Sequence, residues 1–366
     1  MSQNNDLLYL KIKSDLLAKL KTLTPNERIP SRNELIKEYK VTRTTIDRAI
    51  SELIGEGYLY SRDGSGTYVS ENSTYAYRQS DSGIASWGMI LPNIMHDTYP
   101  GILRGVEDIA NKYGRNTVIC NTDNDMEKQA NYIYKLIDSG VEGIVIVPAI
   151  SVESDLRPFK MLQEKNVPFI FCNRGVVGIE APEVTSNSFY GGYIATKHLI
   201  EQGFRRIAYI SRPMYSVSIE RYQGYASALE EAGIELSDDY VFFEESIHDE
   251  KPGYEITKML IDRKPLVDAI FCFNDVLAKG AYEALTEAGI KVGTDIGLVG
   301  YDNTNICENL AVKLTSVKFK TYEIGTKAAE LLFSIANGEK IQKNKIVVLQ
   351  PKLVVRESSG SNRNPN

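Results

Sequence analysis

The hydrophobic and polar positions divide the chain into three zones. Residues 6–69 combine helical spacing with a short hairpin pattern, residues 70–86 are mostly polar, and residues 87–358 alternate apolar runs with amphipathic stretches. The pattern therefore predicts a first domain over residues 1–70, a linker over 71–86 and a long second domain over 87–358.

Three helices and a hairpin are predicted in the first zone. Residues 7–20 place apolar side chains on one helical face, and Ser31 and Glu34 have the spacing of a capping box that starts a second helix. A third helix follows, with apolar positions spaced i, i+3, i+4 and i+7 over residues 46–53. Two short strands then flank a glycine-rich turn at residues 62–66, which predicts a hairpin. This order of elements is that of a winged helix-turn-helix.

In such a unit the third helix enters the major groove of DNA, and phosphate contacts fix its register. Arginine can donate two hydrogen bonds to guanine, threonine can contact a phosphate or a base, and glycine lets the backbone approach the duplex. The residues of these types at suitable positions are Arg32, Arg43, Thr44, Thr45, Arg48, Gly64 and Gly66. The pattern alone leaves open a second interpretation, a solvated helix face on a small interaction domain.

The first zone resembles the DNA-binding domain of the GntR family. The stretches that carry the resemblance are residues 28–35, 41–49, 53–59 and 64–69. It implies binding to operator DNA, with Arg32, Arg43, Arg48 and Gly66 at contact positions. Asn33 stands where the family often has arginine, and Asp47 where it often has arginine or glutamate, so the base preference does not carry over.

The second zone predicts an α/β fold with parallel sheets. Apolar strand candidates cover residues 87–91, 117–121, 143–147, 168–172, 206–211, 268–273 and 296–301. Helical stretches between them include residues 101–113, 127–138, 190–202, 222–232 and 276–288. Near-continuous apolar strands that alternate with amphipathic helices favour sheets covered on both faces. About 270 residues are long for one such sheet, so we expect two lobes.

Ligands of open α/β sheets bind beyond the carboxyl ends of the strands. The polar residues that follow the predicted strands, or begin a helix beyond one, include Tyr99, Asn173, Arg174, Arg221, Asn274 and Asp302. Arginines, amides and a carboxylate around an aromatic ring suit a neutral, polyhydroxylated ligand, whose hydroxyls both donate and accept. The competing interpretation is that several of these groups only cap helices, as Asn274 or Asp275 could do for a helix at residue 276.

The second zone resembles the effector domain of the LacI family and the related periplasmic sugar-binding proteins. Residues 167–174, 198–208, 269–275 and 299–302 carry this resemblance, which extends over about residues 87–356. It implies a two-lobed type I periplasmic-binding-protein fold, a homodimer, and ligand contacts at Tyr99, Arg174, Arg221, Asn274 and Asp302. His248 falls where the family often has a stacking aromatic residue, and Asn173 replaces the usual aspartate. The GntR-type unit stands in place of the LacI family's own headpiece and hinge helix.

Composition and charge add limits to this interpretation. The net charge of −6 divides into +2 over residues 1–70 and −8 over the remainder, a modest asymmetry that does not by itself indicate a nucleic-acid partner. Four widely spaced cysteines without a CxxC pair are typical of buried thiols. The apolar runs fall far short of the ~18 residues of a membrane span. The first residues lack the basic start and apolar stretch of a secretory signal, so a cytoplasmic location without membrane contact is expected.

The sequence contains none of the motifs that would favour an enzyme. It has no Gly-Lys-Ser/Thr phosphate loop, Rossmann glycine fingerprint or nucleophile elbow, and no catalytic residue, cofactor or metal is expected. We therefore expect a homodimeric transcription factor, a repressor of carbohydrate-utilisation genes, that binds operator DNA and responds to a sugar. A nucleobase effector, a phosphosugar paired with Arg174 and Arg221, and a solute-binding protein without DNA affinity remain open.

Overall fold

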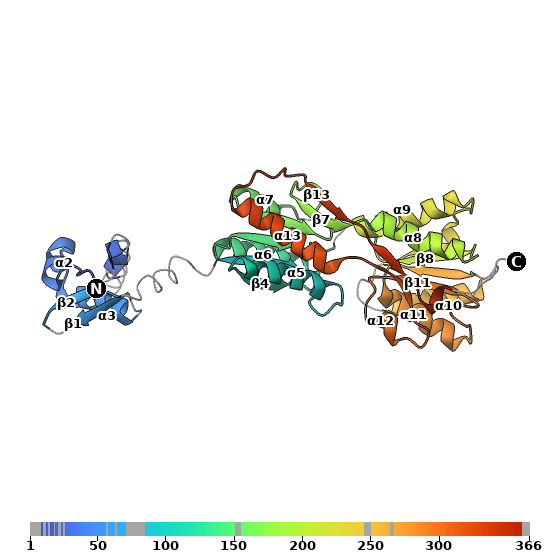
Figure 1. Cartoon of the computed structure of the whole chain (residues 1–366), viewed down its shortest axis with the longest axis horizontal. Helices are drawn as coiled ribbons and strands as arrows, with labels where there is room; N and C mark the ends of the chain where they lie inside the picture. The colour runs from blue at the N-terminus through green and yellow to red at the C-terminus, as the bar shows by residue number, and fades with distance from the viewer. Residues whose placement is uncertain are drawn as a thin grey trace. The chain divides into compact units, whose positions relative to one another are not determined.

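The computed structural model describes residues 9, 12–13, 15–17, 19–20, 23–24, 26–55, 58–62, 64–70, 85–150, 155–244, 250–263 and 267–360. Contacts divide the chain into two compact units, Met1–Ala85 and Ser86–Asn366 (Figure 1). Most of the expected linker lies outside the described residues, and the boundaries at residues 70, 87 and 358 stay predictions.

The first unit has the expected winged-helix elements. They are α2 (Arg32–Tyr39), α3 (Arg43–Gly55), β1 (Leu59–Arg62) and β2 (Gly66–Val69), preceded by helical residues among positions 9–20. The capping box is confirmed: Ser31 N donates to Glu34 Oε2 at 2.6 Å, and Ser31 Oγ accepts from Glu34 N. β1 and β2 pair antiparallel. Ile12, Leu16, Leu35 and Leu53 lie in the core that joins the helices to this hairpin.

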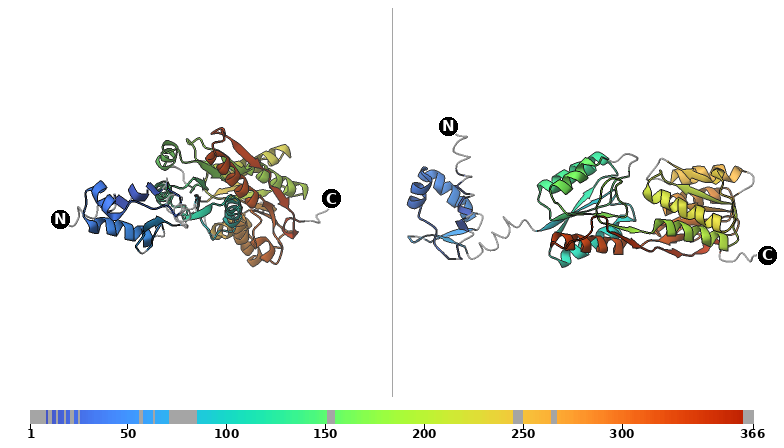
Figure 2. Two further views of the ribbon diagram at one scale, coloured as in Figure 1. Left: turned by 60° about the vertical axis from the view of Figure 1, so that its left-hand side comes forward. Right: turned by 90° about the horizontal axis from the view of Figure 1, so that it is seen from above.

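The second unit has two lobes, as the sequence predicts, and each lobe is built on a six-stranded sheet (Figure 2). The sheet of lobe 1 is entirely parallel, in the order β13 (Ile346–Leu349), β7 (Glu183–Ser186), β6 (Phe169–Cys172), β5 (Gly143–Ile146), β3 (Ser86–Leu91) and β4 (Asn116–Asn121). Its helices are α5 (Tyr99–Lys112), α6 (Met126–Asp138), α7 (Arg157–Glu164) and α13 (Thr321–Ala336). The central strands β5 and β6 are buried throughout, as expected for a sheet covered on both faces.

Lobe 2 repeats this architecture with one antiparallel edge strand. Its sheet order is β14 (Lys352–Val354), β12 (Thr315–Lys318), β11 (Gly297–Tyr301), β10 (Ala269–Cys272), β8 (Ile207–Ser211) and β9 (Val241–Phe243), with β14 antiparallel to β12. The accompanying helices are α8 (Ser188–Glu201), α9 (Ser216–Glu231), α10 (Lys251–Asp262), α11 (Asp275–Glu287) and α12 (Ile306–Asn309). The chain passes between the lobes after β7, after β12 and between β13 and β14, so three segments connect them.

The four cysteines are buried free thiols, as their apolar surroundings predict. None of the helices in the described part of the chain combines the length and apolar character that a membrane span requires. Within the same residues, His, Cys, Asp and Glu side chains do not gather in a group of three that could hold a metal ion.

Helices α8 and α9 touch through reciprocal glycines, and this contact positions the backbone of Arg221. A Cβ atom on Gly192 of α8 would overlap with the carbonyl oxygen of Arg221, and one on Gly224 of α9 would overlap with that of Phe189. The two backbones therefore approach more closely than any larger side chain would allow. The same reciprocal arrangement recurs between α10 and α11 and between α5 and α13.

Asp275, the first residue of α11, holds the turn that follows β11. It is fully buried and accepts hydrogen bonds from Thr304 N at 2.7 Å, Thr304 Oγ1 at 3.0 Å and Ser316 Oγ at 2.7 Å. Asp302 and Asn303 in this turn have φ angles of 98° and 53°. Non-glycine residues rarely adopt this left-handed region, so the Asp275 hydrogen bonds stabilise a conformation that the local sequence would not hold alone.

Substitution of Gly192 should separate α8 from α9. We expect Gly192→Ala to lower the free energy of unfolding of the second unit by about 1–3 kcal/mol, because the added methyl group overlaps with backbone atoms. Gly55→Ala, in the first unit, is the control for the added methyl group: nothing lies within 4 Å of the added Cβ, so the free energy of unfolding of that unit should stay within about 1 kcal/mol of wild type. Urea unfolding measures both, and equal stabilities of the Gly192→Ala variant and wild type would contradict the close approach.

The buried carboxyl of Asp275 should make stability depend on pH. Burial, together with the nearby charge of Asp302, raises the pKa of Asp275 to about 7. An unfolded aspartate titrates near 3.9, so between about pH 4 and 7 the folded chain holds more protons than the unfolded chain. The free energy of unfolding should therefore fall as pH rises through this window, by about 1 kcal/mol per pH unit from this group.

Unfolding at several pH values tests this assignment by comparing wild type with Asp275→Asn. The Asp275→Asn protein should have a flatter pH profile between pH 4.5 and 7, whereas Asp239→Asn, at a largely exposed position, should keep the wild-type slope. Parallel profiles for wild type and Asp275→Asn would contradict it.

Candidate functional site

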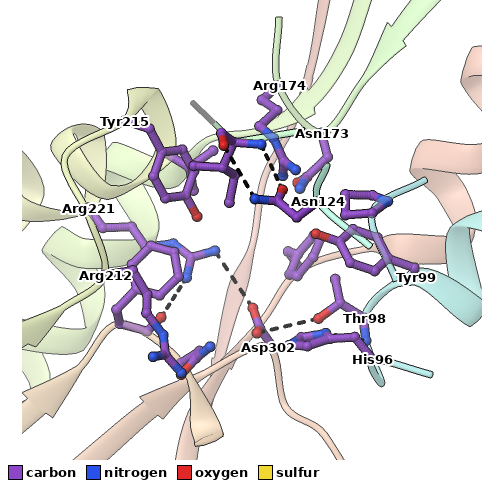
Figure 3. Close-up of a pocket in the computed structure, with 16 residues that line it drawn as sticks. His96, Thr98, Tyr99, Asn124, Asn173, Arg174, Arg212, Tyr215, Arg221 and Asp302 are labelled. Atoms are coloured by element: carbon purple, nitrogen blue, oxygen red, sulfur yellow. Dashed lines mark hydrogen bonds and ion pairs between the residues drawn. The ribbon is translucent and has the colours of Figure 1, made fainter. Parts of the chain in front are cut away.

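A cleft lies between the two lobes of the second unit, at the carboxyl ends of their strands. It contains about 560 Å³ of space free of protein atoms, counted with the solvent at its mouth. Its lining residues are Pro92, His96, Thr98, Tyr99, Asn124, Ile150, Asn173, Arg174, Arg212, Tyr215, Val217, Arg221, Phe273, Asn274, Asp302 and Phe319. In Figure 3, Asn124 and Arg174 lie on one side of the gap, Arg221 and Asp302 lie on the other, and Tyr99 and Tyr215 flank it.

Arg221 on α9 is a buried cation with partners on several sides. Only 5% of its surface is exposed. Its guanidinium carbon lies 3.4 Å from the ring centroid of Tyr301 and 4.1 Å from that of Phe273, and Nη1 donates to the carbonyl oxygen of Phe273 at 2.5 Å. Nη2 lies 3.7 Å from Asp302 Oδ1, and the buried Nε has no hydrogen-bond partner among the described residues. A buried arginine with an unused donor can bind a ligand oxygen.

Asp302 contacts side chains of both lobes. Arg221 of lobe 2 lies beside one carboxylate oxygen, and Thr98 of lobe 1 donates its hydroxyl to the other at 3.4 Å. Burial raises the pKa of Asp302, and the positive charge of Arg221 opposes that rise. A carboxylate in this position can accept hydrogen bonds from ligand hydroxyl groups.

Arg174 supplies a second buried cation from lobe 1. Its Nε donates to the carbonyl oxygen of Pro148 at 2.7 Å, and its guanidinium carbon lies 5.9 Å from the ring centroid of Tyr215 in lobe 2. Its Nη2 is buried and has no hydrogen-bond partner in the described part of the chain. The preceding Asn173 has a left-handed φ of 68° and lines the cleft.

Two amides in the cleft also have structural contacts. Asn274 caps α11, since its Oδ1 accepts from Leu277 N at 3.0 Å, as the capping interpretation predicts. It lines the cleft as well, so both interpretations describe it. Asn124 Oδ1 accepts from Ile150 N at 2.7 Å, which ties the loop after β4 to the segment that follows β5.

The cleft brings together six of the seven residues that the sequence predicts for a ligand site, namely Tyr99, Asn173, Arg174, Arg221, Asn274 and Asp302. The seventh, His248, lies outside the described residues. Arg212 directly follows β8, so the strand-end rule applied to β8 would have found it. Thr98 belongs to the same stretch after the first strand as Tyr99. Tyr215 and Phe273 are aromatic residues of lobe 2, so a rule that selects polar residues after strands does not find them.

The predicted DNA-contact residues of the first unit differ in exposure. Arg43 is the most exposed of the three arginines, and Arg48 stacks on the Tyr9 ring at 3.8 Å. Arg32 is hydrogen-bonded to Asp47. Thr44 is exposed, but Thr45 is buried and its hydroxyl lies 2.9 Å from that of Thr42, so it faces into the domain and not outward.

The turn glycines also have the conformations that their residue type predicts. Gly64 and Gly66 have φ angles of 68° and 134°. A Cβ on Gly66 would approach Arg28 Nε to 2.7 Å. The Arg28 side chain is flexible and can shift, so it is the backbone angle that favours glycine at position 66.

Comparisons with known proteins agree with both units. Residues 8–69 match the family model of "Bacterial regulatory proteins, gntR family", and residues 196–359 match that of "Periplasmic binding protein-like domain". The arabinose metabolism transcriptional repressor of Halalkalibacterium halodurans is 27% identical, and the alignment covers 98% of this chain and 97% of the relative.

Two further proteins match about three quarters of the chain. The HTH-type transcriptional repressor PurR of Histophilus somni is 32% identical over 75% of this chain and 81% of its own length. The crystal structure of a LacI family transcriptional regulator from Enterococcus faecium with bound ribose superposes with a TM-score of 0.65 at 29% identity, over 76% of this chain and all of that one.

The fold of the two units and these relatives agree on one family. The chain belongs to the bacterial transcriptional regulators, with a GntR-family DNA-binding domain joined to a LacI-type effector-binding domain.

Proposed function

We propose that the protein is a homodimeric repressor of carbohydrate-utilisation genes, released from its operator or recruited to it by a sugar. Arg221, Asp302 and Thr98 carry this proposal, because they join groups of both lobes at one point of the cleft. A sugar hydroxyl can donate to Asp302 and accept from arginine, while the ring faces of Tyr99 and Tyr215 offer stacking surfaces. The named relatives, a repressor of arabinose metabolism and a regulator with bound ribose, support a sugar as the effector.

The cleft suits binding and not catalysis. Its charged groups are held by ring faces, backbone carbonyls and one another, and the named relatives are transcriptional repressors. A sugar that contacts both lobes would stabilise their closed arrangement. A coupling free energy of roughly 1–3 kcal/mol would then change operator affinity about 5- to 150-fold.

Selection of genomic fragments on the purified full-length protein tests this function. The selection is carried out at one stated salt concentration, because affinity for DNA depends on salt. We expect enrichment of a palindromic sequence beside sugar-uptake or glycosidase genes. Absence of enrichment, with and without a mixture of sugars, would leave a solute-binding protein and contradict the repressor.

Replacement of Arg221 should separate ligand binding from DNA binding. Arg221→Lys keeps a positive charge beside Asp302 but loses the planar set of donors, so sugar affinity should fall about 10- to 150-fold while operator affinity stays unchanged. Arg115→Lys is the matched control, since Arg115 pairs with Glu142 before β4, at the end of the sheet away from the cleft. Calorimetric titration with a panel of pentoses and hexoses measures the change, and unchanged sugar affinity would remove Arg221 from the site.

Replacement of Arg43 should have the opposite effect. Arg43 begins α3 and is 73% exposed, so Arg43→Ala should weaken operator binding about 5- to 150-fold while sugar affinity is retained. Arg104→Ala, which removes an exposed arginine from α5, should leave both affinities unchanged. Fluorescence anisotropy with labelled operator measures both variants, and wild-type affinity for Arg43→Ala would exclude it from the interface.

A further inference from the structure

Asp47 lies between two arginines of the proposed DNA-binding surface. Arg32 donates its Nε to Asp47 Oδ1 at 2.7 Å, and Arg43 Nε lies 3.6 Å from Asp47 Oδ2. The carboxylate therefore uses one oxygen for each arginine. About 41% of the Asp47 side chain is exposed, so this arrangement forms part of the surface.

The contact links separate elements of the domain. Arg32 begins α2, whereas Arg43 and Asp47 lie one turn apart at the start of α3. Arg32 also donates its Nη1 to Thr67 Oγ1 on β2 at 3.2 Å. Asp47 thus connects both helices of the helix-turn-helix, and through Arg32 it reaches the hairpin.

The occupied atoms determine which edges of the arginines remain for a partner. Asp47 contacts the Nε side of both guanidinium groups. Arg43 has no hydrogen bond from Nη1 or Nη2 to any residue that the structure describes, so the outer edge of its guanidinium group can donate two parallel hydrogen bonds. This is the geometry with which arginine binds O6 and N7 of guanine.

An acidic residue lowers the affinity of this surface for DNA. Non-specific affinity for DNA comes from neutralised phosphates, and a carboxylate between two arginines cancels part of their charge. It also reduces the rotamer freedom of two long side chains before they meet DNA, which favours binding to sites that match their orientation.

We propose that Asp47 is a specificity-determining positioning residue, which together with Arg32 orients Arg43 toward a guanine edge in the major groove and lowers affinity for other duplex DNA. The inference rests on the proposed DNA-binding function. In this proposal Arg32 is not simply a phosphate contact. Arg32 holds Asp47 in place, and Asp47 in turn holds Arg43.

Asp47→Asn tests the proposal, because it keeps the size of the side chain and removes its charge. Two duplexes serve as probes: the one recovered by selection from a random-sequence library, and a scrambled duplex of the same composition. We expect affinity for the scrambled duplex to rise, affinity for the selected duplex to fall, and their ratio to drop at least about 10-fold. Asp47→Glu should restore much of the ratio.

Glu38→Gln is the matched control, because it removes one carboxylate from α2 that pairs with Lys19 and with neither Arg32 nor Arg43. It should leave the ratio near the wild-type value. Thermal unfolding of all variants identifies any loss of folding, which would lower affinity for both duplexes together. An unchanged ratio for Asp47→Asn, or an equal rise for both duplexes, would overturn the positioning role. A wild-type protein that does not discriminate between the duplexes would instead contradict the proposed function itself.

Discussion

The ligand cleft depends on one buried ion pair, Arg221 with Asp302. An arginine of which only 5% is exposed is costly to bury unless its charge and donors are satisfied, and removal of one partner would leave the other uncompensated. The structure meets this requirement with a carboxylate, a backbone carbonyl and two ring faces. Because Thr98 reaches the same carboxylate from the other lobe, the pair also marks the point where the lobes meet.

The surrounding fold holds both members of this pair in position. The glycine contact between α8 and α9 determines how closely the backbone of Arg221 approaches α8. Asp275 holds the left-handed turn that carries Asp302, and its own burial raises its pKa. Backbone contact and hydrogen bonding thus preorganise the binding groups, which reduces the free energy that a ligand would spend on ordering them.

Much of this architecture could be predicted from the sequence. Buried strands such as 169–172 and 269–272 are short, continuous apolar runs, and the polar residues after them line the cleft. The edge strands β9, β13 and β14 are not fully buried and have only three or four residues each, and the pattern did not predict them although β9 and β13 are apolar throughout. The contact of Arg32 with Asp47 spans 15 positions and depends on how α2 crosses α3, which no local pattern encodes.

The central claim is that the sugar in the cleft and the DNA bound by the first unit are energetically coupled. Thermodynamic linkage requires the coupling to be reciprocal: if a sugar changes operator affinity by a given factor, operator must change sugar affinity by the same factor. The most direct measurement is calorimetric titration of a sugar into the full-length protein, with and without saturating selected operator. The account predicts a sugar affinity that shifts about 5- to 150-fold, equal to the shift in operator affinity. Tight sugar binding that is identical in the presence and absence of operator would contradict it.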